Sequence, residues 1–198
     1  MLNAQSIVEL HDRLNGAWHS DPNFAPHTDP FLTQVAMHHR ANFDLWHIED
    51  EARRPHATDA DLAGVKRRID RTNQHRNDLA EQIDQAIVAH LAPLHLPNPE
   101  APLHSESPGL IVDRLSILAL KIYHTREETI RNGAPAGHAE RNLERLAVLE
   151  NQRADLAACL DSLWRETLAG TRRFKLYRQL KMYNDPALNP AIYSARSE

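Results

Sequence analysis

The sequence predicts an all-α fold: a single-domain bundle of about five long helices, followed by a short basic helix. Glycine is scarce, with 6 residues among 198, which disfavours a chain built from many tight turns. The 12 prolines lie mainly between long segments in which apolar residues recur every three or four positions, as in an amphipathic helix. A chain of this length buries roughly 70% of its unfolded surface, so one domain over residues 1–198 is expected to hold a substantial core.

The first two helices are predicted near residues 4–19 and 31–53, with a proline-containing linker between them. Asp29 and Pro30 form a typical helix start, in which a capping side chain precedes a proline at the first helical position. The inward-facing residues are Ile7, Leu10, Leu14 and Trp18 in the first helix, and Leu32, Val35, His39, Phe43 and Trp46 in the second.

The third helix is predicted to begin at Thr58 and to continue to about His90. Thr58 and Asp61 have the spacing of a capping box, in which each side chain binds the backbone amide of the other residue. At 1.5 Å per residue this helix would be ~45 Å long, so it must pack within a bundle. Its apolar stripe consists of Leu62, Val65, Ile69, Leu79, Ile83 and Ile87.

Prolines also mark the start of the fourth helix. Five of them lie between residues 91 and 108 and predict a proline-rich connector over residues 91–107 that crosses the bundle. Ser107 and Pro108 then begin a helix that ends near residue 131. Its segment 110–123 is rich in Ile and Leu and also fits a buried strand, but its length and the lack of a partner strand favour a helix.

The remainder of the chain is predicted to form a long helix and a basic C-terminal segment. The long helix covers about residues 138–168 and turns a leucine-rich stripe inward: Leu143, Leu146, Leu149, Leu156, Leu160, Leu163 and Trp164. The segment of residues 171–198 consists of a short basic helix, Arg172 to Tyr183, and an irregular tail.

The composition excludes several classes of protein. No apolar run approaches the ~20 residues that a membrane-spanning helix needs, and the N-terminus lacks the pattern of a signal peptide, so we expect a cytoplasmic protein. The single cysteine, Cys159, excludes an internal disulfide and a multi-thiolate metal site. Its neighbours Leu156 and Leu160 predict a thiol packed in the core.

The net charge of −4 is unevenly distributed along the chain. It amounts to −7 over residues 1–107 and +3 over residues 108–198, which favours an anionic ligand near the C-terminal part rather than binding along a nucleic acid. The predicted basic helix carries five basic and no acidic residues. Phosphate, a polyanionic glycan, a membrane surface and the acidic face of the same chain are the alternatives for its contact.

The third helix carries a polar stripe beside its apolar one. The members recur at spacings of three and four, with Arg76 near the seam to the core: Lys66, Asp70, Asn73, Asn77, Glu81 and Asp84. Short Asp and Asn side chains are poor helix formers, so their repetition favours a functional face. The alternative is an ordinary solvated face, which usually mixes Glu, Lys, Gln and Ala.

The second helix offers a matching polar face. Its members are Asn42, Trp46, Glu49, Asp50 and Arg53. Two antiparallel helices would therefore face each other across a polar groove beside an aromatic ring. Because buried charges must be paired, we expect Asp50 or Glu49 to pair with Arg76 or Lys66. The alternative interpretation is a structural ion-pair network.

Polar residues also interrupt the apolar fourth helix. They are Asp113, Arg114, Ser116 and Lys121. Lys121 lies between Leu118 and Ile122, where it needs a carboxylate or an anionic ligand unless its aliphatic stem carries the amine to solvent.

Metal-binding patterns in the sequence are weak. The Glu-x-x-His motif of ferritin-like di-metal bundles is absent, and pairs such as His124 with Glu127 are expected by chance among thirteen histidines. We therefore predict no transition-metal site. Mg²⁺ is the more credible ion, because carboxylates on facing helices offer it oxygen ligands: Asp50, Asp70, Glu81 and Asp84.

In these segments the chain resembles a bacterial family known only as domain of unknown function 4254 (DUF4254). The matching motifs are Asn42-x-x-Leu45-Trp46-x-x-Glu49-Asp50-x-Ala52-Arg53, Ile69-Asp70-x-x-Asn73-Gln74-x-Arg76-Asn77-Asp78, Ser107-Pro108-Gly109 with Asp113-Arg114-Leu115-Ser116-Ile117-Leu118 and Lys121, and Lys181-Met182-Tyr183-Asn184-Asp185-Pro186. The resemblance implies an association with glycosyltransferases of cell-envelope polysaccharide synthesis. It therefore suggests sugar, nucleotide-sugar or glycan-phosphate ligands.

The first functional hypothesis is a cytoplasmic protein of cell-envelope polysaccharide metabolism that binds or acts on a phosphorylated sugar, nucleotide sugar or glycan. If it is an enzyme, a hydrolase or transferase is expected, with Glu49, Asp50 and Asp70 as general acid and base or as Mg²⁺ ligands. The predicted binding residues are Asn42, Trp46, Arg53, Lys66, Asn73, Arg76, Asn77, Asp113, Arg114, Lys121 and Lys181.

Two alternative functions are consistent with the same residues. One is a non-catalytic accessory subunit that binds a glycosyltransferase through the basic C-terminal helix, in which case the polar stripe is a structural network. The other is an Mg²⁺-dependent all-α nucleotide pyrophosphatase, which the spacing Glu81-x-x-Asp84 suggests.

Overall fold

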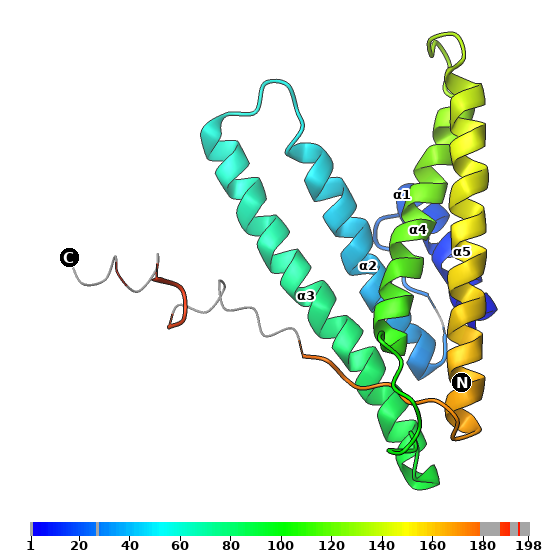
Figure 1. The fold of residues 1–198 in the computed structure, drawn as a ribbon. Coiled ribbons are helices and arrows are strands. Elements are labelled where there is room, and N and C mark those ends of the chain that lie inside the picture. Colours follow the sequence, from blue (N-terminus) through cyan, green and yellow to red (C-terminus); the bar gives the residue numbers. More distant parts are fainter. Residues whose placement is uncertain (1, 27, 179–186, 191–193, 195–198) are drawn as a thin grey trace.

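Two helical hairpins make up most of the chain in the computed structural model (Figure 1). The first hairpin consists of α2 (Pro30–Glu51) and α3 (Asp59–Leu91), and the second of α4 (Pro108–Thr129) and α5 (His138–Leu168). The N-terminal helix α1 (Ala4–Ser20) packs against α4, α2 and α5. The described residues thus form a single all-α domain, as the sequence predicts.

The structure describes residues 2–26, 28–178, 187–190 and 194. Within these ranges, none of the helices combines the length and the apolar character that crossing a membrane requires.

Local sequence signals set the ends of the helices. The Asp29 side chain accepts hydrogen bonds from the backbone amides of Phe31 and Leu32 at the start of α2. Thr58 and Asp61 form the expected capping box, which begins α3. The five long predicted helices therefore agree with the observed ones to within about two residues at each end.

The core is buried where α1 lies against the two hairpins. Its largest fully buried apolar side chains are Ile7, Leu14, Ile83, Leu91, Ile111, Leu115, Leu120, Ile122 and Leu160. The hairpins diverge toward their connecting loops (Figure 1), so apolar residues near those loops lack a partner helix. Two predicted core residues, Leu62 and Leu143, are consequently exposed, by 38% and 55%.

The connector between α3 and α4 begins with a short 3-10 turn, Ala92–Leu94. It is held by the chain that follows α5: Leu103 and Arg173 form an isolated parallel β-bridge, and the Arg173 side chain donates to the Ala101 carbonyl oxygen at 2.8 Å. Residues 172–178 are therefore not helical, and the prediction of a basic helix beginning at Arg172 is wrong. The rest of that predicted helix, residues 179–183, lies outside the described residues.

The prediction for Cys159 is also wrong, because its thiol is exposed. The inward stripe of α5 passes through Leu156, Leu160 and Leu163, and Cys159 lies about 100° around the helix from Leu160. Consecutive residues of a helix therefore lie on different faces, although they are neighbours in the sequence.

Candidate functional site

A pocket of about 340 Å³ opens between α2, α3 and α4, toward the diverging ends of the hairpins. Polar residues and the Trp46 ring line it together with an apolar wall: Asn42, Leu45, Trp46, Glu49, Asp50, Arg53, Arg76, Ile117 and Leu120. Six of these were predicted as site residues from the faces of the second and third helices. A volume near 300 Å³ lies at the lower end of the range for small-molecule sites.

The charged groups of the pocket differ in their pairing. Glu49 pairs with Arg53 one turn further along α2, at 3.3 Å, and both side chains are well exposed. Asp50 is exposed and has no ion-pair partner among the described residues. The expected pairing of Glu49 or Asp50 with Arg76 or Lys66 is thus replaced by Glu49–Arg53, and the Asp50 carboxylate remains available to a ligand.

A buried network holds the floor of the pocket. The Asp113 carboxylate on α4 accepts hydrogen bonds from His38 Nε2 and Asn42 Nδ2, both at 3.0 Å, and lies 3.4 Å from Arg76 Nε. Burial raises the pKa of Asp113, but the His38 hydrogen bond, the nearby positive groups and the Asn42 amide outweigh it and hold that pKa below its usual value. Asp113 is therefore ionised and positions Asn42 and Arg76.

The network continues into the core through Ser116. Asn42 Nδ2 donates to the Ser116 hydroxyl at 3.0 Å, and that hydroxyl lies 2.7 Å from His39 Nδ1. His39 Nε2 in turn lies 2.9 Å from the side-chain oxygen of Asn15. Burial and the charge of His38 lower the pKa of His39 to about 3, so this imidazole is neutral and links α1, α2 and α4.

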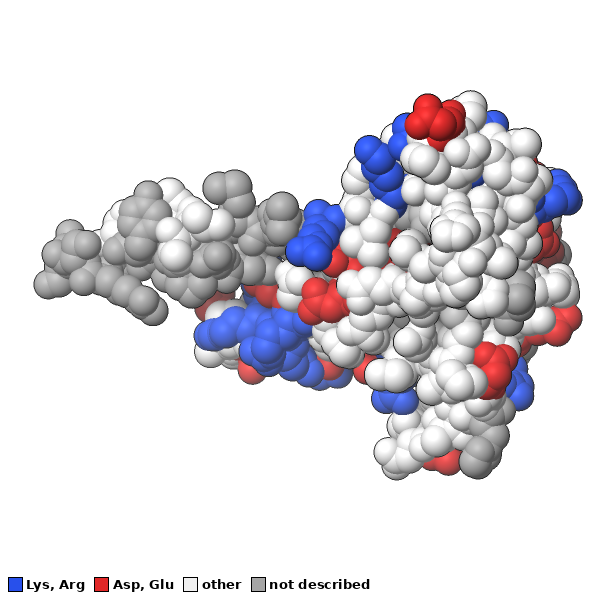
Figure 2. Space-filling model, turned by 90° about the horizontal axis from the view of Figure 1, so that it is seen from below, with Lys and Arg blue, Asp and Glu red and all other residues white. Residues whose placement is uncertain are grey.

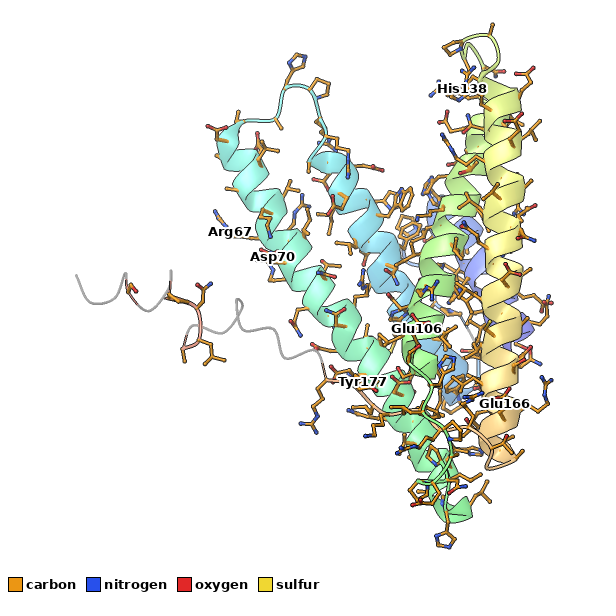
Figure 3. All side chains as sticks on the ribbon, in the orientation of Figure 1. Arg67, Asp70, Glu106, His138, Glu166 and Tyr177 are labelled. Carbon is orange, nitrogen blue, oxygen red and sulfur yellow. The ribbon has the colours of Figure 1, made fainter. Side chains whose placement is uncertain are left out.

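Three predicted residues on the first half of α3 do not line this pocket. Lys66 pairs with Asp70 across one turn, and their side chains are 67% and 41% exposed. Figure 3 places Asp70 and Arg67 on the upper half of α3, far along the helix from Tyr177. Asn73 is half-buried and is likewise not among the lining residues.

Arg114 and Lys121 belong to a different surface. They line a groove between α4 and α5 together with Asp155, and Arg114 also binds both carboxylate oxygens of Glu106, at 3.0 and 2.9 Å. The predicted anion-binding residues are thus divided between two faces of α4. Lys181 lies outside the described residues.

Asp84 has a structural position at the start of α4. Its carboxylate oxygens accept hydrogen bonds from the Ser107 hydroxyl at 2.5 Å and the Gly109 amide at 2.6 Å. A side chain on Gly109 would meet the Ala80 carbonyl oxygen at 2.4 Å, so the close approach of α3 and α4 requires glycine there. Burial raises the pKa of Asp84 to about 6, although both hydrogen bonds oppose this shift.

Asn77 lies next to Asp84 in a small cavity of about 40 Å³. Arg76, Asp113 and Tyr177 also line this cavity, which places the chain after α5 directly behind the Asp113 network. Tyr177 lies beside the lower half of α3 (Figure 3). The four carboxylates predicted to hold Mg²⁺ do not meet at one point. Asp84 and Glu81 both line the small cavity, where Asp84 binds the start of α4. Asp70 pairs with Lys66, and Asp50 lies in the larger pocket.

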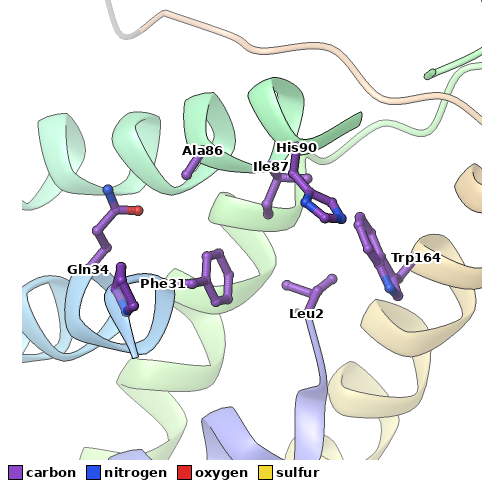
Figure 4. A pocket seen from close by; sticks show the side chains of 8 residues that line it. Leu2, Phe31, Gln34, Ala86, Ile87, His90 and Trp164 are labelled. Carbon is purple, nitrogen blue, oxygen red and sulfur yellow. The ribbon is translucent and has the colours of Figure 1, made fainter. Parts of the chain in front are cut away.

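Two other surfaces differ from the α2–α3–α4 pocket in the charges that they carry. A pocket of about 310 Å³ between the ends of α2, α3 and α5 is almost wholly apolar, with Phe31, Ile87 and Trp164 among its walls (Figure 4). Seen from this end of the molecule, Lys and Arg side chains concentrate on the side where α3 lies, and a broad area carries few charges (Figure 2). Among the described residues, the apolar pocket therefore offers no charged side chain to a ligand.

Three histidines that no sequence spacing relates to one another meet next to the pocket. His19 of α1, His47 of α2 and His124 of α4 each offer a ligand atom, and these atoms lie within 4.8 Å of one another. Among the described residues, they are the only group of three or more His, Cys, Asp or Glu side chains near enough to hold one ion. The His124 ring stacks on Trp46, with 4.9 Å between centroids, which connects the cluster to the pocket.

The fold and the pocket define a class of all-α proteins built from two helical hairpins, with a charged inter-helix site beside an aromatic ring. The chain belongs to the family described as protein of unknown function (DUF4254), whose model matches residues 32–176. The match includes every residue that lines the pocket, whereas α1 precedes it. Comparisons with curated proteins and with solved structures gave no match.

Proposed function

We propose that the pocket between α2, α3 and α4 binds a phosphorylated sugar or a nucleotide sugar. One observation carries the proposal: the pocket brings an aromatic ring, two carboxylates and two guanidinium groups around one cavity. An aromatic face packs against the C–H groups of a sugar ring, carboxylates accept its hydroxyl protons, and guanidinium groups bind phosphate with charge-assisted hydrogen bonds.

Each side chain has a specific role in this proposal. Trp46, which His124 supports from one side, supplies the platform for the sugar ring. Arg76, which Asp113 holds in place, and the exposed Arg53 bind the phosphate. Asp50 accepts hydrogen bonds from sugar hydroxyls. In a hydrolase or transferase acting on this ligand, Glu49 and Asp50 would be the general acid and base or would carry Mg²⁺.

The proposal includes a cellular setting. We place the protein in the cytoplasm, in the metabolism of cell-envelope polysaccharides, because the resemblance to the family implies an association with glycosyltransferases that use such ligands. Of the alternatives, the nucleotide pyrophosphatase has the least support, since both carboxylate oxygens of Asp84 already bind Ser107 and Gly109. An accessory subunit would use the exposed Lys175, Tyr177 and Arg178 to contact a glycosyltransferase.

The experiment is a binding titration with matched variants. Sugar 1-phosphates, nucleotide sugars, unphosphorylated sugars and inorganic phosphate are each titrated into the full chain, with and without Mg²⁺, by calorimetry and thermal shift. The Asp50→Asn variant should lose roughly 10-fold or more in affinity, because hydrogen bonds to charged groups contribute about 1.5–3 kcal/mol. Asp70→Asn, an exposed carboxylate outside the pocket, is the matched control and should bind as the unaltered protein does.

A second variant tests the phosphate contact. Arg53→Gln should weaken phosphorylated ligands by roughly 10-fold and leave unphosphorylated sugars unchanged. The absence of binding across the whole panel, or an equal loss in Asp50→Asn and Asp70→Asn, would contradict the proposal.

A further inference from the structure

The histidine cluster next to the pocket has hydrogen bonds that orient all three rings in the same way. His19 Nδ1 lies 2.7 Å from the Asn15 carbonyl oxygen, and His47 Nδ1 lies 2.8 Å from the Phe43 carbonyl oxygen. His124 Nδ1 lies 2.9 Å from the Glu127 carboxylate. Each partner can only accept a hydrogen bond, so Nδ1 carries the proton in every ring and the neutral ring keeps its lone pair on Nε2.

One of these three Nε2 atoms is buried and has no hydrogen-bond partner. It is His124 Nε2, and it is unusual because buried polar atoms are nearly always paired. An unpaired imidazole nitrogen beside two other imidazoles is the arrangement that a metal ion satisfies.

The surroundings of the cluster match those of metal-binding histidines. Such histidines usually donate their second ring nitrogen to a backbone carbonyl or a carboxylate, which fixes the ring and increases its basicity. Here two rings use carbonyl oxygens and the third uses Glu127. Aromatic rings flank the group, with Tyr123 stacked on His19 at 4.4 Å and Trp46 stacked on His124.

From this arrangement we propose that His19, His47 and His124 bind one divalent transition-metal ion of the Zn²⁺ class. Three neutral imidazoles suit zinc and its neighbours, whereas Mg²⁺ and Ca²⁺ require oxygen ligands. The ligand nitrogens of a tetrahedral zinc site lie about 3.4 Å apart, so small ring rotations from the observed separation of up to 4.8 Å complete the site. Three protein ligands leave the fourth position to water, as in catalytic zinc sites.

The proposal differs from the sequence analysis, which predicted no transition-metal site, and it does not depend on the proposed sugar ligand. Its test uses metal alone. The tag-free full chain, stripped with a chelator, is titrated with Co²⁺, whose visible absorption is strong in four-coordinate sites, and the bound Co²⁺ is then displaced with Zn²⁺. We expect one ion per chain and a rise in melting temperature when Zn²⁺ is added.

Matched histidine variants assign the ligands. His47→Gln and His19→Gln should each weaken Zn²⁺ binding by more than about 100-fold, since even the loss of an outer hydrogen-bond partner costs 10–100-fold. Glu127→Gln should weaken it by roughly 10-fold. His75→Gln, an exposed histidine of α3 outside the cluster, should bind as the unaltered chain does.

The folding of each variant is checked separately, so that a loss of Zn²⁺ binding is not confused with unfolding. Far-UV circular dichroism and the melting temperature without metal establish that each variant is folded, and the exposed position of His19 makes His19→Gln the safest substitution. A chain without the Co²⁺ absorption bands, or a folded His19→Gln variant that binds Zn²⁺ as tightly as His75→Gln does, would overturn the proposal.

Discussion

The two halves of the polar stripe on α3 contain similar residues but lie in different environments. In the first half, Lys66 and Asp70 pair across one turn of an exposed surface. In the second half, Arg76 reaches the Asp113 carboxylate, and Asp84, which is 3% exposed, binds the start of α4. Exposed ion pairs contribute about 0–1 kcal/mol, whereas breaking a buried pair costs several times more. Both halves have the same helical spacing of polar residues. Only the contact with α4 makes the polar residues of the second half contribute more to stability.

The largest expected effect comes from removing the α4 carboxylate that Arg76 of the buried half contacts. Asp113→Ala leaves Arg76 without its carboxylate and His38 and Asn42 without their acceptor, so we expect a loss of about 3–5 kcal/mol in the free energy of unfolding. Urea denaturation measures it. Asp113→Asn keeps an acceptor and should lose less. A loss below about 1 kcal/mol in Asp113→Ala would show that the network contributes little to stability.

A second prediction uses the pH dependence of Asp84. Its pKa of about 6 in the folded protein lies above the ordinary value of 3.8, so the folded state holds this proton more tightly than the unfolded chain does. The contribution of this group to stability is therefore greatest below pH 4 and falls by about 3 kcal/mol as the pH rises to above 6.

The Asp84→Asn variant isolates that contribution. An asparagine still accepts from the Gly109 amide, and its NH₂ group donates to the Ser107 oxygen. Relative to the unaltered protein, Asp84→Asn should therefore gain about 2 kcal/mol between pH 4 and pH 7, measured by denaturation at each pH. A difference that stays constant over this range would mean that Asp84 titrates normally in the folded protein.

The smallest effect is expected in the exposed half. Asp70→Ala removes an exposed pair between residues four apart on a helix, and such pairs contribute about 0.3–0.5 kcal/mol. The change in the free energy of unfolding should stay below about 0.5 kcal/mol and should shrink in high salt. A loss above 1 kcal/mol would remove the distinction between the two halves, and it would require a role for Asp70 that its exposed position does not indicate.

Much of the architecture follows from short-range signals. The starts of α2 and α3 are predictable because capping requires only neighbouring residues. The capping residues are Asp29 and Pro30 for α2, and Thr58 and Asp61 for α3. The α2 face of the pocket was also predictable, since residues at helical spacing share a face whatever the partner is. Trp46, Glu49 and Asp50 lie in the pocket for this reason.

Other features depend on partners distant in the sequence. Residues 172–178 follow the connector because Arg173 forms a β-bridge with Leu103 and donates a side-chain hydrogen bond to the Ala101 carbonyl oxygen. No local sequence pattern predicts that contact. The exposure of Leu62 and Leu143 depends on the divergence of the hairpins. The separation of Arg114 and Lys121 from Arg76 depends on which faces of α4 the other helices cover.

The sequence by itself determined the all-α class, the helix ends and the polar faces of α2 and α3, because these follow from local propensity, capping and periodicity. Only the tertiary structure decided which half of the α3 stripe is buried and which histidines meet. His19, His47 and His124 come from three helices and share no spacing, so only the packing of α1 against α2 and α4 brings them together.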